Sequence, residues 1–332
     1  MEFRTIVDAA AMPLRISYTS PILLLGSCFA ENIGQRLHHA KFEVLVNPFG
    51  IVYNPISLAQ LLARLCADKP FVAGDLYQHG DIWLSFLHHG RFSSTDRQAA
   101  LEQINEQYKA GVTLIRRADF LIITLGTMYY YCRQDTGQVV SNCHKLAADF
   151  FVRRAAGVDE VVAALRPVLG ELRRINPTLK FIFTLSPVRH WKDGAVDNHY
   201  SKSVLMVATR LLCEELGSDV AYYFPAYEIM TDDLRDYRFY EADMLHPNTV
   251  AIAYIWEQFR AACISNDKQT LALMGQIEKI RTAMTHRPHQ VQSEAYKRFR
   301  LQQLDIVENL AACYPYMDWS KEKLFFSDKE NG

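Results

Sequence analysis

A short apolar run that stops at a glycine and leads into a helix is the feature that most restricts how this chain can fold. Residues 22–25 are all isoleucine or leucine, and the run ends at Gly26. Phe29, Ile33 and Leu37 then follow at intervals of four, which places them on one face of a helix. Apolar runs end at a turn residue in the same way at residues 120–125, 181–185 and 220–224. We therefore predict four buried strands joined by helices.

Two stretches between these strands have the apolar spacing of amphipathic helices. One carries apolar residues at positions 161, 162, 165, 169 and 172. The other carries them at 204, 205, 208, 211 and 212, with Gly217 as its expected C-cap. Strands that alternate with helices predict a parallel sheet covered on both faces, with ligands bound beyond the carboxyl ends of the strands. The loop after each strand is therefore a candidate site.

The 332 residues are expected to form one α/β domain, residues 1–264, and a helical C-terminal extension, residues 265–332. Within the first part, residues from about 57 to 110 are less regular and are a candidate insertion or lid. Beyond Cys263 the pattern is wholly helical, with helices expected around residues 271–284 and 295–310. Such an extension is a candidate surface for homo-oligomer formation.

Charge and cysteine content exclude several classes of protein. Thirty-six Lys and Arg residues against thirty-seven Asp and Glu give a formal net charge of -1, so no overall field favours nucleic acid or anionic lipid. The run at residues 22–25 is too short for a signal sequence or a membrane span. Seven cysteines without a C-x-x-C pair are typical of reduced cytosolic thiols, and no zinc-ligand spacing is evident. We expect a cytoplasmic protein that binds a small molecule, with no metal, membrane or nucleic-acid partner.

Ser27 and the segment 243–246 carry the residue types of a hydrolytic site. Ser27 lies between a predicted strand and a predicted helix, where backbone N–H groups and the helix dipole favour a negatively charged oxygen. Asp243, three residues before His246, can accept the imidazole Nδ1–H and leave Nε2 free as a base. Each feature also has a simpler interpretation, because Ser27 can be only a helix N-cap and Asp243 only a cap beside a surface histidine.

The two features together resemble the GSCFA family, whose name is the motif found here at residues 26–30, and through it the wider SGNH (GDSL-like) hydrolases. The likeness extends from about Leu24 to Phe259. Further matching segments lie in order along the chain: Asn47-Pro48-Phe49-Gly50, Leu125-Gly126-Thr127, Asn142-Cys143-His144-Lys145, Ser186-Pro187-Val188-Arg189-His190 and Leu234-Arg235-Asp236-Tyr237-Arg238-Phe239-Tyr240.

The resemblance implies a flavodoxin-like three-layer sandwich and hydrolysis of ester-like bonds through a serine nucleophile, without a metal or an organic cofactor. By the matching positions, Ser27 takes the place of the nucleophile, and Asp243 and His246 take the catalytic D-x-x-H position. Gly50 is the candidate oxyanion-hole glycine, which would donate its backbone N–H.

The chain departs from the SGNH pattern at residues 126–129. SGNH enzymes usually have G-x-N-D here, but Met128 stands where the asparagine would donate to the oxyanion. Loss of one such donor typically costs roughly a hundred- to thousandfold in rate. Asn142 and His144 are the candidate replacements, although an ordinary turn at these positions is an equal alternative. The residues assigned to oxyanion or substrate binding are Gly50, Gly126, Asn142, His144, Arg189 and His190.

Other residues keep alternative sites open. Arg189 and His190 are candidates to bind a charged substrate group or to form a structural ion pair. Cys28 is a rival nucleophile at the helix N-terminus. Lys202 invites a Ser-Lys dyad, although an exposed lysine in the first turn of a helix is the simpler expectation. Aromatic residues near the candidate site suit the apolar faces of a sugar or ordinary packing: Tyr129, Tyr130, Tyr131, Trp191, Tyr237, Phe239 and Tyr240.

The function predicted from these residues is a serine esterase or deacylase for a small acylated substrate, with an O-acetylated carbohydrate as the preferred instance. An acyltransferase would use the same residues with another acceptor in place of water. A non-catalytic binding protein that keeps the pocket is the alternative from a different class.

Overall fold

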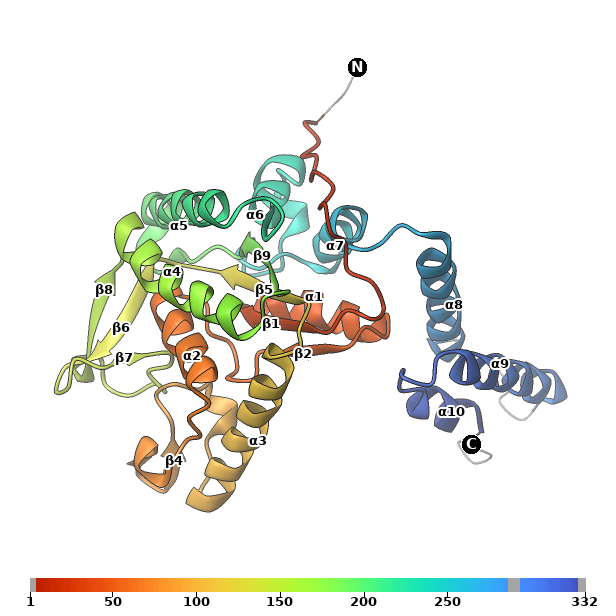
Figure 1. Ribbon diagram of the computed structural model, residues 1–332, viewed down its shortest axis with the longest axis horizontal. Coiled ribbons are helices and arrows are strands. Elements are labelled where there is room, and N and C mark those ends of the chain that lie inside the picture. Colours follow the sequence, from red (N-terminus) through yellow and green to blue (C-terminus); the bar gives the residue numbers. More distant parts are fainter. Residues whose placement is uncertain (1–3, 286–292, 328–332) are drawn as a thin grey trace.

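The computed structural model describes residues 4–285 and 293–327, and a five-stranded parallel sheet forms its centre (Figure 1). The strands lie in the order β2-β1-β5-β9-β10, which is the 2-1-3-4-5 order of flavodoxin-like folds when only this sheet is counted. The five strands are β1 (Ile22–Gly26), β2 (Val44–Val46), β5 (Phe120–Leu125), β9 (Lys180–Leu185) and β10 (Ala221–Phe224). The predicted α/β fold with a parallel sheet is confirmed.

Helices cover both faces of the sheet because alternate strand residues point to opposite sides. In β1, Leu23 and Leu25 pack into the core on one face, and Ile22 and Leu24 pack into the core on the other. The first face is covered by α2 (Pro55–Ala67), α3 (Arg97–Ile115), α4 (Val158–Ile175) and α5 (Gly194–Leu216). The second face is covered by α1 (Cys28–His39) and α7 (Thr249–Cys263), while the short α6 (Ala226–Glu228) follows β10. The predicted C-cap of α5, Gly217, is confirmed with a φ of 82°.

Two small antiparallel sheets extend from the first face. One has the order β7-β6-β8, and the other is a hairpin of β3 and β4. Their strands are β3 (Tyr77–His79), β4 (Ile82–Leu84), β6 (Tyr129–Arg133), β7 (Val139–Val140) and β8 (Phe151–Ala155). The candidate lid, residues 57–110, contains most of α2, the hairpin and much of α3, and both helices pack in the main core. Its role as a lid stays a prediction.

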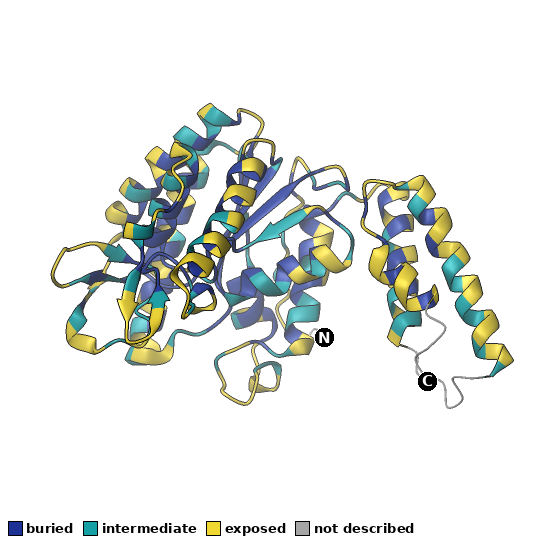
Figure 2. Cartoon of the chain, turned by 90° about the horizontal axis from the view of Figure 1, so that it is seen from below, coloured by how far each residue is buried: buried dark blue, intermediate teal, exposed yellow. Residues whose placement is uncertain are grey.

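Three helices follow the α/β part: α8 (Lys268–Thr285), α9 (Glu294–Cys313) and α10 (Ser320–Ser327). The two helices expected here are confirmed, and α10 is an addition. Figure 2 shows this unit standing beside the α/β part with exposed residues along its outer faces. Its inner residues Leu273, Ile277 and Val307 belong to the same apolar core as α1 and α7.

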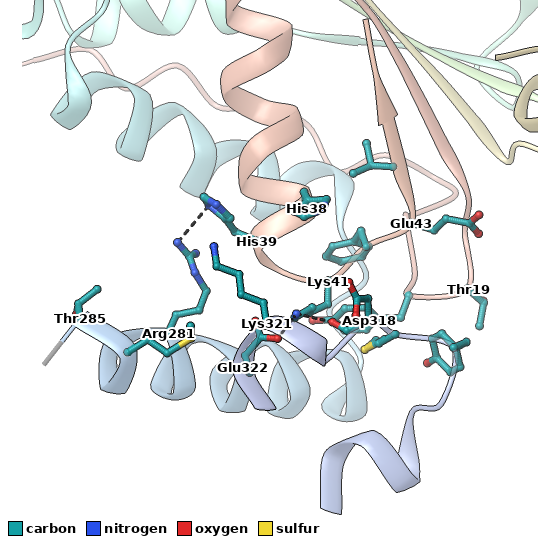
Figure 3. A pocket seen from close by; sticks show the side chains of 16 residues that line it. Thr19, His38, His39, Lys41, Glu43, Arg281, Thr285, Asp318, Lys321 and Glu322 are labelled. Atoms are coloured by element: carbon teal, nitrogen blue, oxygen red, sulfur yellow. Dashed lines mark hydrogen bonds and ion pairs between the residues drawn. The ribbon is translucent and has the colours of Figure 1, made fainter. Parts of the chain in front are cut away.

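Polar contacts join the C-terminal helices to the end of α1 (Figure 3). Lys41 Nζ donates to the Asp318 carbonyl at 2.6 Å and to Glu322 Oε2 at 2.7 Å. Arg281 Nη2 and His39 Nδ1 lie 3.2 Å apart. A pocket of about 750 Å³ lies at this junction, but none of the predicted site residues lines it. The junction therefore serves to attach the C-terminal helices, and a homo-oligomer through them stays a prediction.

The described residues contain neither a helix that could span a membrane nor a cluster of side chains that could hold a metal ion. Within residues 4–285 and 293–327, no helix is long and apolar enough to cross a lipid bilayer. Over the same ranges, no group of three or more His, Cys, Asp or Glu side chains is arranged to hold a metal ion.

Candidate active site

Ser27 lies directly after β1, at the start of α1, and its side chain is almost fully buried. The turn depends on Gly26, which has a φ of 146° and whose Cβ, if present, would lie 2.3 Å from the Thr124 carbonyl oxygen. Ser27 Oγ accepts the Phe29 N–H at 3.2 Å, so the residue is the N-cap of α1. The same hydroxyl donates to Ser186 Oγ at 3.0 Å. Ser27 is therefore both a cap and a hydroxyl placed at the carboxyl edge of the sheet.

Asp243 and His246 form a hydrogen-bonded pair in the loop before α7. Asp243 Oδ2 and His246 Nδ1 lie 2.6 Å apart. Asp243 Oδ1 accepts the backbone N–H groups of Leu245 at 2.8 Å and of His246 at 3.0 Å. These backbone hydrogen bonds, together with the imidazole, lower the pKa of Asp243 to about 2. Asp243 therefore stays ionised at neutral pH and orients the ring with Nε2 free, as the spacing predicts.

Arg189 holds the loop that carries His246. Its backbone N–H donates to the Leu245 carbonyl at 3.1 Å, and its Nη1 donates to the Met244 carbonyl at 3.2 Å. Met244 has a φ of 60°, and the loop needs such support to keep this left-handed conformation. The guanidinium also lies 4.0 Å above the Trp191 ring. The sequence suggested that Arg189 binds a substrate anion or forms an ion pair. In the structure it contacts backbone carbonyls and an aromatic ring.

One pocket of about 460 Å³ brings the two halves of the predicted site together. Ser27, Cys28, Arg189, His190 and His246 all line it. Among the described residues, no hydrogen bond joins Ser27 to His246, because the Ser27 hydroxyl is directed at Ser186. The pocket opens at the carboxyl ends of β1 and β5, the point where the strand order reverses and where ligands bind in such folds.

The structure does not place the expected oxyanion donors in this pocket. The Gly50 N–H donates to the Asn47 carbonyl at 2.7 Å, and the Gly126 N–H donates to the Tyr53 carbonyl at 2.7 Å. Met128 is buried in the core. None of these three residues lines the pocket. The N–H groups of the two glycines are therefore directed at backbone carbonyls in the structure.

The loop residues Asn142 and His144 are also engaged elsewhere. Asn142 Oδ1 accepts the His144 N–H at 2.7 Å, and His144 Nε2 lies 2.8 Å from the Ser85 carbonyl oxygen. Neither side chain lines the pocket, although their neighbours Ser141 and Cys143 do. The turn interpretation of this segment is therefore the one that the structure supports.

A family model describes most of the chain. Residues 21–259 match the model of the GSCFA family. This chain belongs to the GSCFA family. Residues 277–331 match a second model, the C-terminal domain of GSCFA domain proteins. No curated protein matches the chain.

Several solved structures share some similarity with this GSCFA protein. A carbohydrate esterase family 3 structure from Talaromyces cellulolyticus is 9% identical, with 79% of this chain and 99% of that chain covered and a TM-score of 0.35. The acetyl xylan esterase Est2A from the rumen bacterium Butyrivibrio proteoclasticus is 10% identical, with coverage of 74% and 64% and a TM-score of 0.36. A family 2 carbohydrate esterase from Corynascus thermopiles is 19% identical, with coverage of 48% and 38% and a TM-score of 0.28. Similarity at this level gives no information about the substrate of the GSCFA chain.

Cys28, the rival nucleophile, lines the pocket but is poorly suited to form a thiolate. Burial raises the pKa of its thiol, and the nearby Glu31 carboxylate raises it further. The thiolate is the reactive form of cysteine. Less of Cys28 is therefore ionised than of an exposed cysteine, which weakens the case for it as the nucleophile.

Lys202 is the residue whose sequence interpretation was wrong. It is not an exposed lysine in the first turn: it lies well inside α5 and is only 1% exposed. Its Nζ donates to the Ser186 carbonyl at 2.7 Å, and burial lowers its pKa to about 7. The spacing contained a signal, because Lys202 lies three residues before Leu205 and seven before Thr209, both on the buried face. Lys202 thus holds Ser186, whose hydroxyl oxygen accepts a hydrogen bond from the Ser27 hydroxyl.

The aromatic residues near the site divide into two groups. Tyr129, Tyr131 and Trp191 line the pocket, and the Trp191 side chain is 39% exposed. Tyr237 and Tyr240 surround Arg189, with ring centroids 5.8 and 5.5 Å from its guanidinium carbon. The rings of the first group border the pocket, and each has one face under a cation: Arg153 over Tyr129, Lys192 over Tyr131 and Arg189 over Trp191. The second group packs against the arginine that supports the His246 loop.

Proposed function

We propose that this GSCFA protein is a serine esterase or deacylase in which Ser27 is the nucleophile and His246 the base. The observation that carries the proposal is the shared pocket. A buried serine at the N-terminus of a helix and an Asp-paired histidine, from opposite ends of the α/β part, line the same cavity. A helix N-terminus favours negative charge on the attacking oxygen.

The proposed reaction proceeds through an acyl-enzyme. Ser27 Oγ attacks the acyl carbonyl carbon, and its proton passes to His246 Nε2 while Asp243 holds the Nδ1–H. His246 then donates this proton to the departing alcohol. A water molecule then gives a proton to His246 and adds to the acyl carbonyl carbon. The bond to Ser27 Oγ breaks, His246 returns the proton to this oxygen, and the acid is released. The hydroxyl must first turn from Ser186 Oγ, its acceptor in the structure, toward His246.

The pocket favours a small acylated substrate, and we propose an O-acetylated carbohydrate. Its volume of about 460 Å³ lies in the range of small-molecule sites. Tyr129, Tyr131 and Trp191 line the pocket, and the ring faces that Arg153, Lys192 and Arg189 leave uncovered suit the apolar faces of a sugar.

Covalent trapping tests the nucleophile without knowledge of the natural substrate. A small fluorophosphonate is expected to form one adduct, on Ser27, within the tryptic peptide of residues 16–36. Fragmentation of this peptide by mass spectrometry separates Ser27 from Cys28. Ser27→Ala and His246→Ala are expected to abolish the adduct, and Cys28→Ser is expected to retain it on Ser27.

Two outcomes of this labelling would contradict the proposal. An adduct on Cys28 would make the thiol the nucleophile. The absence of any adduct, together with no hydrolysis of p-nitrophenyl acetate or of a panel of acetylated sugars, would favour a binding protein.

A further inference from the structure

One histidine in the pocket has a ring nitrogen without a partner. His190 Nε2 is buried and has no hydrogen-bond partner among the described residues, and the residue lines the same pocket as Ser27 and His246. A buried polar nitrogen left unpaired has lost its hydrogen bonds to water without gaining others, which is unfavourable. Because the residue lines the pocket, a bound ligand is the group that can supply the missing hydrogen bond.

His190 and His246 differ in their chemical state. Burial, together with the charges of Lys202 and His246, lowers the pKa of His190 to about 3. The ring is therefore neutral at ordinary pH. No carboxylate accepts from it in the described structure, whereas His246 has Asp243. A neutral imidazole of this kind is a weak base but can donate one N–H to a developing negative charge.

Neighbouring groups fix the His190 ring at the carboxyl edge of the sheet. Its backbone N–H donates to Asn198 Oδ1 at 2.9 Å, and its ring centroid lies 4.9 Å from that of Tyr53. A Cβ on Gly126 would lie 2.7 Å from His190 Nε2. The absence of a side chain at Gly126 therefore makes room for this nitrogen, directly after β5 and next to β1, the strand that precedes Ser27.

Positions 50, 126 and 128, where the sequence pattern leads us to expect oxyanion donors, offer no unengaged donor in the structure. Met128 replaces the asparagine of the related enzymes and is buried in the core. The N–H groups of Gly50 and Gly126 are bonded to backbone carbonyls. We propose that His190 Nε2–H binds the acyl carbonyl oxygen and stabilises the oxyanion formed when Ser27 attacks. This inference rests on the proposed esterase function.

A sulfur substitution in the substrate separates this role from a structural one. O-(p-Nitrophenyl) thionoacetate has sulfur in place of the carbonyl oxygen, and sulfur is the weaker hydrogen-bond acceptor. His190→Leu is expected to lower kcat for p-nitrophenyl acetate about 100- to 1000-fold, with KM nearly unchanged. The same variant is expected to lower the ratio of the oxygen-ester rate to the thionoester rate, because the oxygen ester loses the stronger hydrogen bond. His190→Gln, which keeps an N–H donor, is expected to recover part of both.

His88 provides a matched control. It is also buried, its pKa is also lowered to about 3 by burial, and its Nε2 also lacks a partner among the described residues. It packs between Phe71 and Phe92 and does not line the pocket. His88→Gln is therefore expected to leave the oxygen-to-sulfur rate ratio unchanged.

The outcomes distinguish the two proposals. If His190→Leu slows both esters equally, or slows neither while fluorophosphonate still labels Ser27, the oxyanion role of His190 is wrong and the esterase proposal stands. If no turnover depends on Ser27, the proposed function fails, and this inference fails with it.

Discussion

Turnover of p-nitrophenyl acetate is expected to fall by about 10⁴-fold or more in Ser27→Ala, and by a similar factor in His246→Ala. Ser27 supplies the attacking oxygen, and His246 is the pocket histidine that a carboxylate orients, at 2.6 Å from Asp243. The double variant is expected to lose no more than either single variant, because a nucleophile and its base act as a unit. Steady-state kinetics on purified variants, with folding checked by circular dichroism, measures all three.

Asp243→Asn tests, in the same assay, whether the carboxylate that orients His246 is needed. The amide cannot hold the Nδ1–H tautomer as a carboxylate does, so a loss of up to about 10⁴-fold in kcat is expected. Lys192→Met is a suitable control for general effects at the pocket rim. Losses that multiply in the Ser27→Ala/His246→Ala variant would show that the two residues act independently, which the proposed mechanism does not allow.

The sequence predicted the central sheet well where strands are long and buried on both faces. The runs at residues 120–125 and 181–185 are apolar apart from Thr124 and Thr184, and both are strands. β2 went unpredicted because it has only three residues, all half-buried, at the edge of the sheet. The short antiparallel strands are also partly exposed, so their composition differs little from that of a loop.

The site was predictable where its chemistry depends on local spacing. The Asp243-to-His246 interval determines their hydrogen bond, and the position of Ser27 after an apolar run determines its N-cap geometry. The oxyanion donors were not predictable in this way. Whether the Gly126 N–H is free depends on the Tyr53 carbonyl, which approaches from a distant loop. Lys202 was misjudged for a similar reason, because its acceptor Ser186 follows a different strand.

Lys202→Met is expected to give a protein that is more stable than the wild type at neutral pH. The Lys202 ammonium is fully buried, with the Ser186 carbonyl as an acceptor and the Tyr227 ring 5.3 Å away. The nearby Glu228 carboxylate accepts from the Tyr223 hydroxyl at 2.7 and 3.0 Å and forms no ion pair with Lys202. Replacement of a poorly compensated buried charge by an apolar side chain of similar length is expected to stabilise by roughly 1–4 kcal/mol.

The stability difference between Lys202→Met and the wild type is expected to depend on pH. The pKa of Lys202 is about 7 in the folded protein and 10.5 for a free lysine, so between these pH values the unfolded chain binds a proton that the folded protein does not. The wild type therefore gains stability from Lys202 as the pH rises through this window, by at most about 1.4 kcal/mol per pH unit. Lys202→Met lacks this gain. Its stability advantage is expected to be greatest at or below pH 7 and to shrink by about 2 kcal/mol by pH 9.

Urea unfolding of both proteins from pH 6 to pH 9 measures the difference, in which titrating groups that are not coupled to Lys202 cancel. Cys28 and Glu228, whose pKa values the Lys202 charge lowers, contribute to the difference together with Lys202. The exposed Lys192 gives the control, because Lys192→Met is expected to show no pH-dependent difference from the wild type. A constant difference for Lys202→Met would mean that the lysine keeps its ordinary pKa. The stabilised variant is also expected to be the slower esterase, since Lys202 holds Ser186, whose hydroxyl oxygen accepts from Ser27. A buried charge that lowers stability and raises activity would explain why the site contains a lysine where an apolar residue would pack better.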